Sequence, residues 1–212
     1  MITFLTIFST SFLIAFSGAA MPGPVMTATI SESARRGPLA GPLLVAGHAV
    51  LELGLVVLIM HGLAPFLQKA WVFVVIAIAG SIMLTRMALG MLRSIPSLSI
   101  HMDERVQGGA NLLVTGAVLS LSTPYWSLWW ATIGLGYILY CIQFGIVGVI
   151  SFYIGHILGD LVWYSAISVA VGKGRRFLSD RSYRVLIGSC AVFLLALACY
   201  FAWSGVNKAL SL

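Results

Sequence analysis

Charged residues are scarce in this chain. Asp, Glu, Lys and Arg make up 8% of its 212 residues, whereas soluble proteins average about 25%. Hydrophobic residues make up 60%, and the mean hydropathy is +1.03. So little charge excludes an ordinary soluble domain, and the composition predicts an integral membrane protein.

Cysteines and catalytic motifs are also lacking. Cys141, Cys190 and Cys199 are an odd set without a C-x-x-C pair, so we interpret them as small buried hydrophobic residues. The sequence contains no G-x-S-x-G, no H-E-x-x-H and no phosphate-binding motif. These absences argue against an enzyme and against direct use of ATP, and we expect no cofactor. An intramembrane enzyme is the least favoured alternative, because Glu52 and Asp160 match the paired aspartates of an intramembrane protease only in part.

Long apolar stretches occupy nearly the whole chain. Each exceeds the roughly 20 residues that cross a bilayer as a helix. They span about residues 4–30, 39–60, 70–92, 110–138, 143–171 and 185–206. No Lys or Arg precedes Arg35, so we interpret the first stretch as a membrane helix rather than a signal peptide. The predicted fold class is all-α and polytopic, with six transmembrane helices in a single transmembrane domain, 1–212.

The basic residues alternate between loops. Those between helices one and two, three and four, and five and six are Arg35, Arg36, Arg93, Arg105, Lys173, Arg175, Arg176, Arg181 and Arg184. The alternate loops hold only Lys69. Positive loops face the cytoplasm, so we expect the inner (cytoplasmic) membrane of a prokaryote with both termini outside. The net charge of +6 therefore reflects topology, and no nucleic-acid partner is expected.

One phrase occurs twice in the chain. Residues 47–53 read G-H-x-x-x-E-L and residues 155–161 read G-H-x-x-x-D-L. The loops that flank the two phrases have opposite charge bias, as three helices per half require if the second half is inverted. The sequence thus predicts two inverted three-helix repeats, about 1–92 and 110–212, joined by a cytoplasmic linker, 93–109.

Proline interrupts the first helix of each predicted repeat. Pro22, Gly23 and Pro24 lie within helix one, and Thr123, Pro124 and Tyr125 lie within helix four. Proline removes a backbone donor and clashes with the preceding turn, so both helices should break there. Paired interruptions in two repeats indicate a transport site.

Each repeated phrase places a carboxylate inside an apolar helix. A charge at the bilayer centre costs roughly 2.5–3.5 kcal/mol on insertion scales and marks a functional site by default. We therefore interpret Glu52 and Asp160 as part of a substrate and proton pathway. The alternative is a structural polar contact between helices.

A histidine precedes each carboxylate by four residues, on the same helical face. His48 and His156 suit a proton relay with Glu52 and Asp160. The same four side chains also form a ligand set for a divalent transition ion. A metal-ion exporter is therefore the alternative function.

Aromatic residues follow the predicted break in helix four. Trp126, Trp129 and Trp130 share one helical face next to Tyr125. Two interpretations stay open: an aromatic belt at the membrane interface, or a cavity wall that contacts an ammonium group through cation–π interactions. Under the second, Tyr125 and Trp126 belong to the substrate pathway.

Several motifs together resemble the LysE/RhtB family of amino-acid exporters. Ala20-Met21-Pro22-Gly23-Pro24 is similar to the family's P-G-P signature, and the phrase formed by Gly155, Gly159, Asp160 and Trp163 is also similar. The resemblance covers the whole chain, including its length, its six helices and the basic loop at Arg93.

This resemblance implies a secondary transporter, driven by the proton-motive force, that exports an amino acid or a similar small amine-bearing metabolite. The expected partners are that substrate, protons, the lipid bilayer and a second copy in a homodimer. Two positions depart from the family pattern. Val25 follows Pro-Gly-Pro where a polar residue is common, and Thr123-Pro124 stands in place of Asn-Pro.

Overall fold

The computed structural model describes residues 2–67, 69–97, 111–174 and 179–211, and every regular element in these ranges is helical. The elements are α1 (Ile2–Ala19), α2 (Pro24–Arg36), α3 (Ala40–Leu58), η1 (Ile59–Leu63), α4 (Ala64–Leu67), α5 (Ala70–Ser94), η2 (Ile95–Ser97), α6 (Leu112–Leu121), α7 (Pro124–Trp129), η3 (Trp130–Gly134), α8 (Leu135–Ile142), α9 (Gly145–Gly174) and α10 (Asp180–Leu210). The all-α prediction is confirmed. The predicted linker, 93–109, lies mostly outside the described residues, as do Arg105, Arg175 and Arg176.

Four continuous helical segments are long and apolar enough to cross a membrane: Ala40–Leu67, Ala70–Ser94, Gly145–Gly174 and Asp180–Leu210. A fifth span is formed if Thr3–Ala19 and Pro24–Arg36, which are bent by 83°, are counted together. The remaining apolar segment is interrupted, and α6 has only 10 residues. The chain is thus a multi-pass membrane protein, whereas six crossings in two inverted repeats stay a prediction.

Both predicted proline breaks are present. α1 ends at Ala19 and α2 begins at Pro24, while α6 ends at Leu121 and α7 begins at Pro124. The residue before each helix-starting proline, Gly23 or Thr123, has an extended backbone, as steric contact with the proline ring requires. Proline suits the first position of a helix because the N–H it lacks has no partner there.

The segment that follows α3 is kinked within Ile59–Leu63. Gly62 has φ 103° there, a left-handed conformation that glycine adopts without steric cost. A π-helical turn, Trp130–Gly134, follows α7 directly. Such turns are frequent at functional sites.

Glycines allow two helix pairs to cross closely. α9 packs on α1 where a Cβ on Gly155 would overlap the carbonyl of Phe8. α3 packs on α6 where a Cβ on Gly47 would overlap the carbonyl of Leu113, and one on Gly116 would overlap that of Leu44. Small residues permit this approach of two backbones in membrane proteins. Equivalent helices of the two predicted halves therefore make equivalent contacts.

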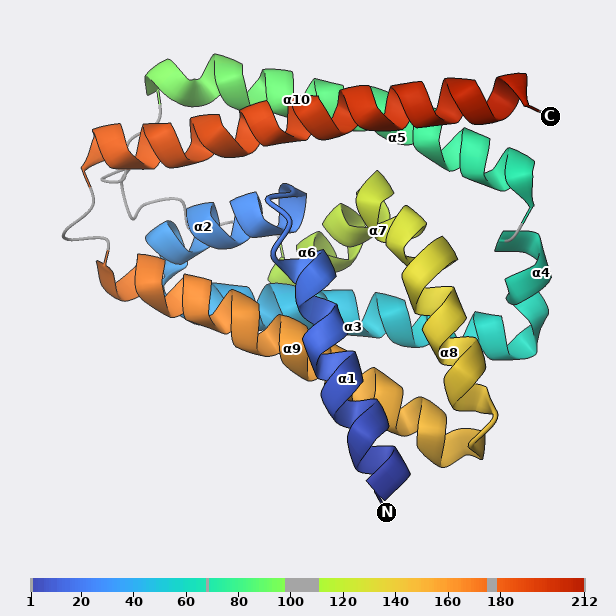
Figure 1. Ribbon diagram of the computed structural model, residues 1–212. Helices are drawn as coiled ribbons and strands as arrows, with labels where there is room; N and C mark the ends of the chain where they lie inside the picture. The colour runs from blue at the N-terminus through green and yellow to red at the C-terminus, as the bar shows by residue number, and fades with distance from the viewer. Residues whose placement is uncertain (1, 68, 98–110, 175–178, 212) are drawn as a thin grey trace.

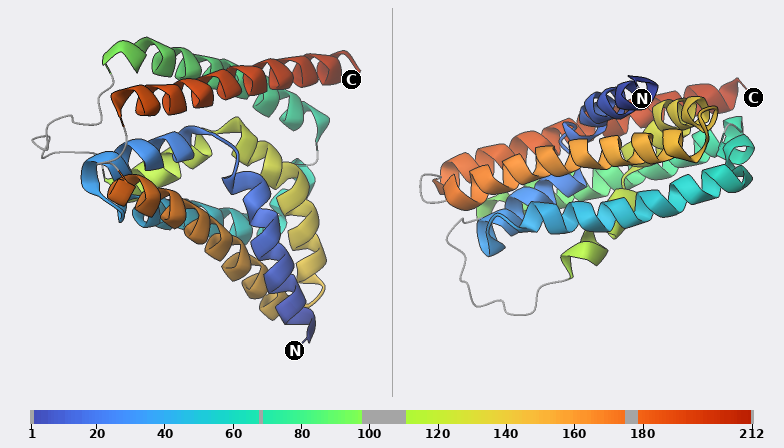
Figure 2. Two further views of the ribbon diagram at one scale, coloured as in Figure 1. Left: turned by 60° about the vertical axis from the view of Figure 1, so that its left-hand side comes forward. Right: turned by 90° about the horizontal axis from the view of Figure 1, so that it is seen from below.

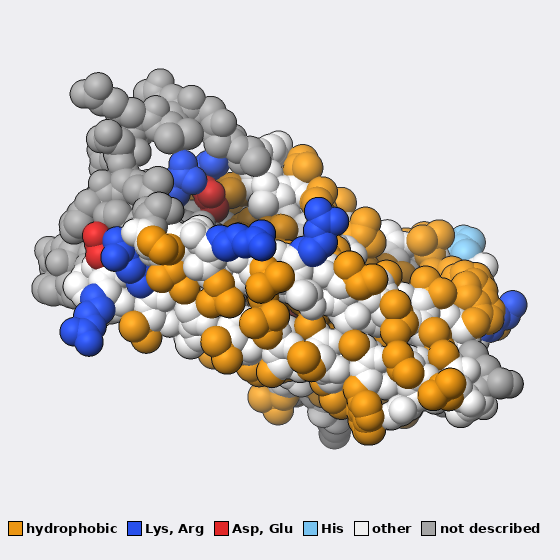
Figure 3. Space-filling view, turned by 90° about the horizontal axis from the view of Figure 1, so that it is seen from above, with side chains coloured by type: hydrophobic (Ala, Val, Ile, Leu, Met, Phe, Trp, Pro, Cys, Tyr) orange, Lys and Arg blue, Asp and Glu red, His pale blue; other side chains and the backbone are white. Residues whose placement is uncertain are grey.

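Helices α5 and α10 form a separate antiparallel pair. They lie side by side along one edge of the molecule, while α1, α2, α3, α6 and α9 form the opposite body (Figures 1 and 2). The outer face of the pair is mostly covered by hydrophobic side chains, and most of its basic residues gather towards one end (Figure 3). Such a face suits contact with lipid.

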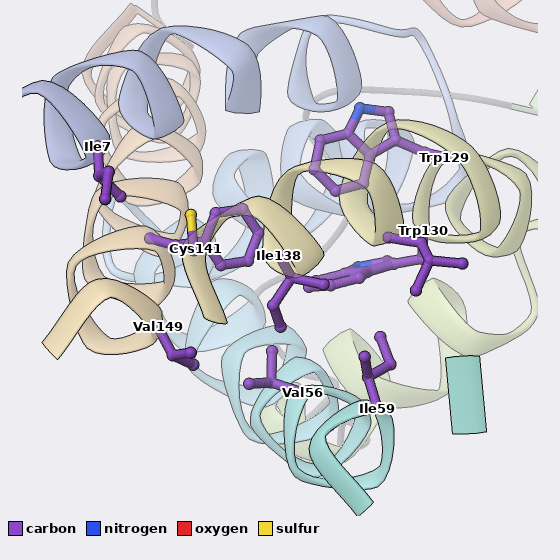
Figure 4. Packing of buried hydrophobic residues seen from close by; sticks show 10 residues of the cluster. Ile7, Val56, Ile59, Trp129, Trp130, Ile138, Cys141 and Val149 are labelled. Carbon is purple, nitrogen blue, oxygen red and sulfur yellow. The ribbon is translucent and has the colours of Figure 1, made fainter. Parts of the chain in front are cut away.

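Of the three cysteines, Cys141 and Cys190 are buried as predicted, whereas Cys199 is exposed. The prediction is wrong for Cys199, because this residue of α10 faces outwards. All three thiols are free. Cys141 belongs to a core cluster in which the indole rings of Trp129 and Trp130 pack with aliphatic residues of several helices (Figure 4).

Candidate functional site

The two intramembrane carboxylates of the repeated phrases lie together. Glu52 on α3 is 1% exposed and Asp160 on α9 is 4% exposed. One histidine nitrogen joins them, because His48 Nε2 lies 3.0 Å from Glu52 Oε1 and 3.2 Å from Asp160 Oδ2. The carboxylates of the two halves therefore meet around a single imidazole.

The second histidine closes the group. His156 Nε2 lies 3.2 Å from Glu52 Oε2 and 3.6 Å from Asp160 Oδ2. We call His48, Glu52, His156 and Asp160 the four-residue centre. The i,i+4 spacing places each histidine on the same helical face as its carboxylate, and the packing of α3 on α9 brings the two faces together.

A short chain of hydrogen bonds orients His48. Its Nδ1 lies 2.8 Å from Ser120 Oγ, and that hydroxyl is 2.8 Å from the carbonyl of Gly116. A serine hydroxyl has one proton, and donating it to Gly116 leaves the oxygen to accept the Nδ1–H of His48. The other ring nitrogen, Nε2, is thereby directed at the carboxylates.

Two tryptophans donate to Glu52. The indole N–H groups of Trp126 and Trp130 lie 2.9 Å and 2.7 Å from Glu52 Oε1. Hydrogen bonds to a charged acceptor are stronger than neutral ones, so these two stabilise a carboxylate that is only 1% exposed. Both side chains thus face the interior rather than a membrane interface.

Trp129 contacts the centre through its ring. Its centroid lies 4.7 Å from that of His156, and its N–H donates to Ser17 Oγ at 3.0 Å. The three tryptophans that the sequence places on one helical face therefore make different contacts. Trp126 and Trp130 donate hydrogen bonds to Glu52, and Trp129 packs against His156.

His156 has a ring nitrogen without a polar partner. Its Nδ1 is buried without a hydrogen bond among the described residues, and Glu52 Oε2, which also lacks one, keeps only its ion-pair contact with His156 Nε2. Buried polar atoms are normally paired, so these atoms can bind a further partner such as water, a cargo group or an ion.

A cavity joins the four-residue centre to both helix breaks. Its volume is about 70 Å³. The break residues that line it are Met21, Pro22, Gly23, Pro24, Val25, Thr123, Tyr125 and Trp126. The Tyr125 hydroxyl donates to the carbonyl of Ser17 at 2.8 Å, which ties α7 to the last turn of α1.

Every predicted site residue except Pro124, whose side chain lies outside the description, contributes to this cavity. Other lining residues were not predicted. Tyr164 lies one turn after Asp160, a spacing that would have revealed it, whereas Leu84, Leu194 and Leu197 come from α5 and α10. The sequence did not distinguish those leucines as cavity residues, because apolar residues occupy most positions of both helices.

Comparisons with known proteins give two matches. A protein-family model described as "LysE type translocator" matches residues 16–205. The "Chemotactic transduction protein ChpE" of Pseudomonas aeruginosa is 26% identical over 204 residues, which cover 92% of this chain and 96% of ChpE. No solved structure matches the chain.

Proposed function

We propose that this chain, which belongs to the LysE type translocator family and is therefore a membrane exporter, exports an amino acid or a similar small amine-bearing metabolite in exchange for protons. The observation that carries the proposal is the four-residue centre. It brings one carboxylate from each half of the chain to a cavity that reaches both broken helices.

The two carboxylates suit an ammonium group. Glu52 Oε2 has no hydrogen bond among the described residues, and Asp160 has only histidine contacts at its Oδ2. An ammonium group carries three donors and would take the place of the histidine contacts. Trp126, on the cavity wall, adds an aromatic ring of the kind that attracts cations.

The broken first helix suits the carboxylate of an amino acid. α2 begins at Pro24 on the cavity wall, and its first backbone bond runs from Thr27 to Gly23. The N-terminus of a helix attracts anions through its unpaired amide groups and its dipole. A cargo with an ammonium and a carboxylate group would therefore find a complement for each on facing walls.

Protons and the ammonium group would compete for the same two carboxylates. Because one site cannot hold both, uptake of protons from outside would release the cargo there, and loss of those protons inside would restore the site. This exchange accounts for the pairing of each carboxylate with a histidine, a residue suited to proton transfer at physiological pH.

The charge distribution supports an inner-membrane location with the termini outside. Basic residues occupy the last turns of α2, α5 and α9 and the first turns of α10. These turns all lie at the left-hand end of Figure 1, while the start of α5, which Lys69 precedes, and the end of α10, which carries Lys208, lie towards the other end. An excess of Lys and Arg marks the cytoplasmic side.

Efflux from vesicles tests the proposal. Vesicles that contain the purified protein are loaded with single amino acids, amines or divalent metals, and release is followed under an imposed pH gradient. We expect gradient-dependent release of an amine-bearing cargo, lost in Glu52→Gln and Asp160→Asn. Glu32→Gln is the matched control, because Glu32 pairs with Arg36 at the end of α2. Unchanged efflux in both centre variants, or release of metals alone, contradicts the proposed cargo.

A further inference from the structure

We propose that the four-residue centre is also a binding site for a divalent transition-metal ion of the zinc class. Two imidazole nitrogens and two carboxylates offer ligand atoms that all lie within 4.8 Å of one another. The inference concerns the same cavity as the proposed export but does not depend on the cargo being an amine.

The spacing of the ligand atoms fits a tetrahedral ion. Ligands at about 2.0–2.1 Å from a tetrahedral Zn²⁺ lie roughly 3.3–3.4 Å from one another. The histidine–carboxylate separations in the centre are 3.0 Å to Glu52 Oε1, 3.2 Å to Glu52 Oε2, and 3.2 and 3.6 Å to Asp160 Oδ2, and all pairs among one ligand atom from each residue lie within 4.8 Å. An ion among these atoms would therefore require the wider pairs to close by up to about 1.4 Å.

The two oxygens of Glu52 have different partners. Oε1 accepts both indole N–H groups, whereas Oε2 makes only the 3.2 Å ion-pair contact with His156 Nε2. Oε2 belongs to a side chain that is 1% exposed and is therefore the oxygen of Glu52 that is left to bind an ion.

The donor set selects the class of ion. Imidazole nitrogens suit zinc, copper, iron and nickel, whereas magnesium and calcium take oxygen ligands. The centre contains no thiolate, which would favour Cu(I) or an iron–sulfur cluster. Two carboxylates balance the charge of a divalent cation, and a buried charge requires such compensation.

Outer hydrogen bonds hold the ligands as they do in known metal sites. A histidine ligand usually donates its second ring N–H to a neighbouring acceptor, and a ligating carboxylate is itself hydrogen-bonded. Ser120 accepts from His48 Nδ1, and Trp126 and Trp130 donate to Glu52. This shell fixes His48 Nε2 towards the ion before the ion arrives.

Cobalt(II) is a suitable probe, since it takes zinc sites and its visible absorption is far more intense in tetrahedral than in octahedral coordination. The full chain, purified in detergent, is titrated with Co²⁺. We expect one ion per chain with a tetrahedral spectrum, which Zn²⁺ then displaces. Asp160→Asn should weaken binding by more than about 100-fold, and Ser120→Ala by roughly 10–100-fold, the range for loss of an outer hydrogen bond.

Two controls separate lost ligands from lost folding. His61→Gln removes an exposed histidine outside the centre and should leave binding unchanged. Asp160→Glu keeps a carboxylate and should retain more affinity than Asp160→Asn, at equal elution volume and unfolding temperature. Absence of Co²⁺ binding, an octahedral spectrum, or equal affinity in wild type and Asp160→Asn would overturn the site and leave an ion-pair network only.

The same preparation separates this inference from the proposed export. Co²⁺ binding without amine efflux would support the metal site while contradicting the amine cargo. Amine efflux without Co²⁺ binding would overturn the metal site alone.

Discussion

The two halves of the four-residue centre have similar geometry and different chemistry. His48 and Glu52 bind side chains from the second broken helix, through Ser120, Trp126 and Trp130. His156 packs its ring against Trp129 of the same broken helix but receives no hydrogen bond from it, and the printed polar contacts of Asp160 are with the two histidines only. The centre thus holds one carboxylate through two indole N–H groups and the other through histidines alone. We infer that Glu52 organises the centre and that Asp160, the less firmly held of the two, exchanges partners more readily.

The largest expected effect comes from leucine substitutions at the two acidic positions, Glu52→Leu and Asp160→Leu. Glu52→Leu leaves the indole N–H groups of Trp126 and Trp130 without their acceptor and leaves both histidines with Asp160 alone, and breaking such a network costs about 3–5 kcal/mol. Asp160→Leu removes an acceptor of histidine contacts only and should cost less. Thermal unfolding in detergent measures both. Equal losses would contradict this difference in how the two carboxylates are held.

A second test removes one indole N–H at a time. Trp130→Phe deletes a hydrogen bond to a charged acceptor, worth about 1.5–3 kcal/mol, whereas Trp129→Phe deletes a neutral bond to Ser17, worth about 0.5–1.5 kcal/mol. Amine efflux should fall further in Trp130→Phe, because Glu52 loses one of its two N–H donors. A larger loss in Trp129→Phe would show that ring packing on His156 outweighs the bonds to Glu52.

The backbone similarity of the halves is tested at their glycine crossings. Gly47→Ala and Gly155→Ala each place a methyl group against a carbonyl of the crossing helix, and overpacking of this kind costs about 1–3 kcal/mol. The two unfolding temperatures should fall by similar amounts. Gly54→Ala is the control, because a Cβ there meets no atom within 4 Å. A loss confined to one crossing would break the equivalence.

The smallest expected effect on stability belongs to Ser120→Ala. The substitution removes two hydrogen bonds of the hydroxyl, to His48 Nδ1 and to the carbonyl of Gly116, each worth about 0.5–1.5 kcal/mol, and His48 would lose the acceptor that orients its ring. We expect nearly normal unfolding with clearly slower efflux. Slower efflux would be absent if the packing of His48 alone fixed its orientation.

The features that the sequence predicts are those that depend on local chemistry. Pro24 and Pro124 start helices whatever surrounds them, and i,i+4 spacing puts His48 beside Glu52 in any helix. The repeated phrase then indicates that both carboxylates matter. The helix class, the breaks and most of the residues that line the cavity could therefore be predicted together.

The features that the sequence leaves open depend on how helices cross. Trp126 fits a membrane belt or a cavity equally well until the rotation of α7 relative to α3 is known. Ser120 bonds to His48 only because Gly47 and Gly116 let α3 and α6 approach closely. No sequence motif predicts the π-helical turn at Trp130–Gly134.

The apolar wall supplied by α5 and α10 has a consequence for how new specificities arise. Leu84, Leu194 and Leu197 reach the cavity from helices that contribute no residue to the four-residue centre. A smaller or larger side chain at these positions would reshape the room for the tail of a cargo while the groups that hold its charge stay in place. Substitutions at these leucines would give related proteins that bind the same charged groups but differ in the size of the cargo that they accept.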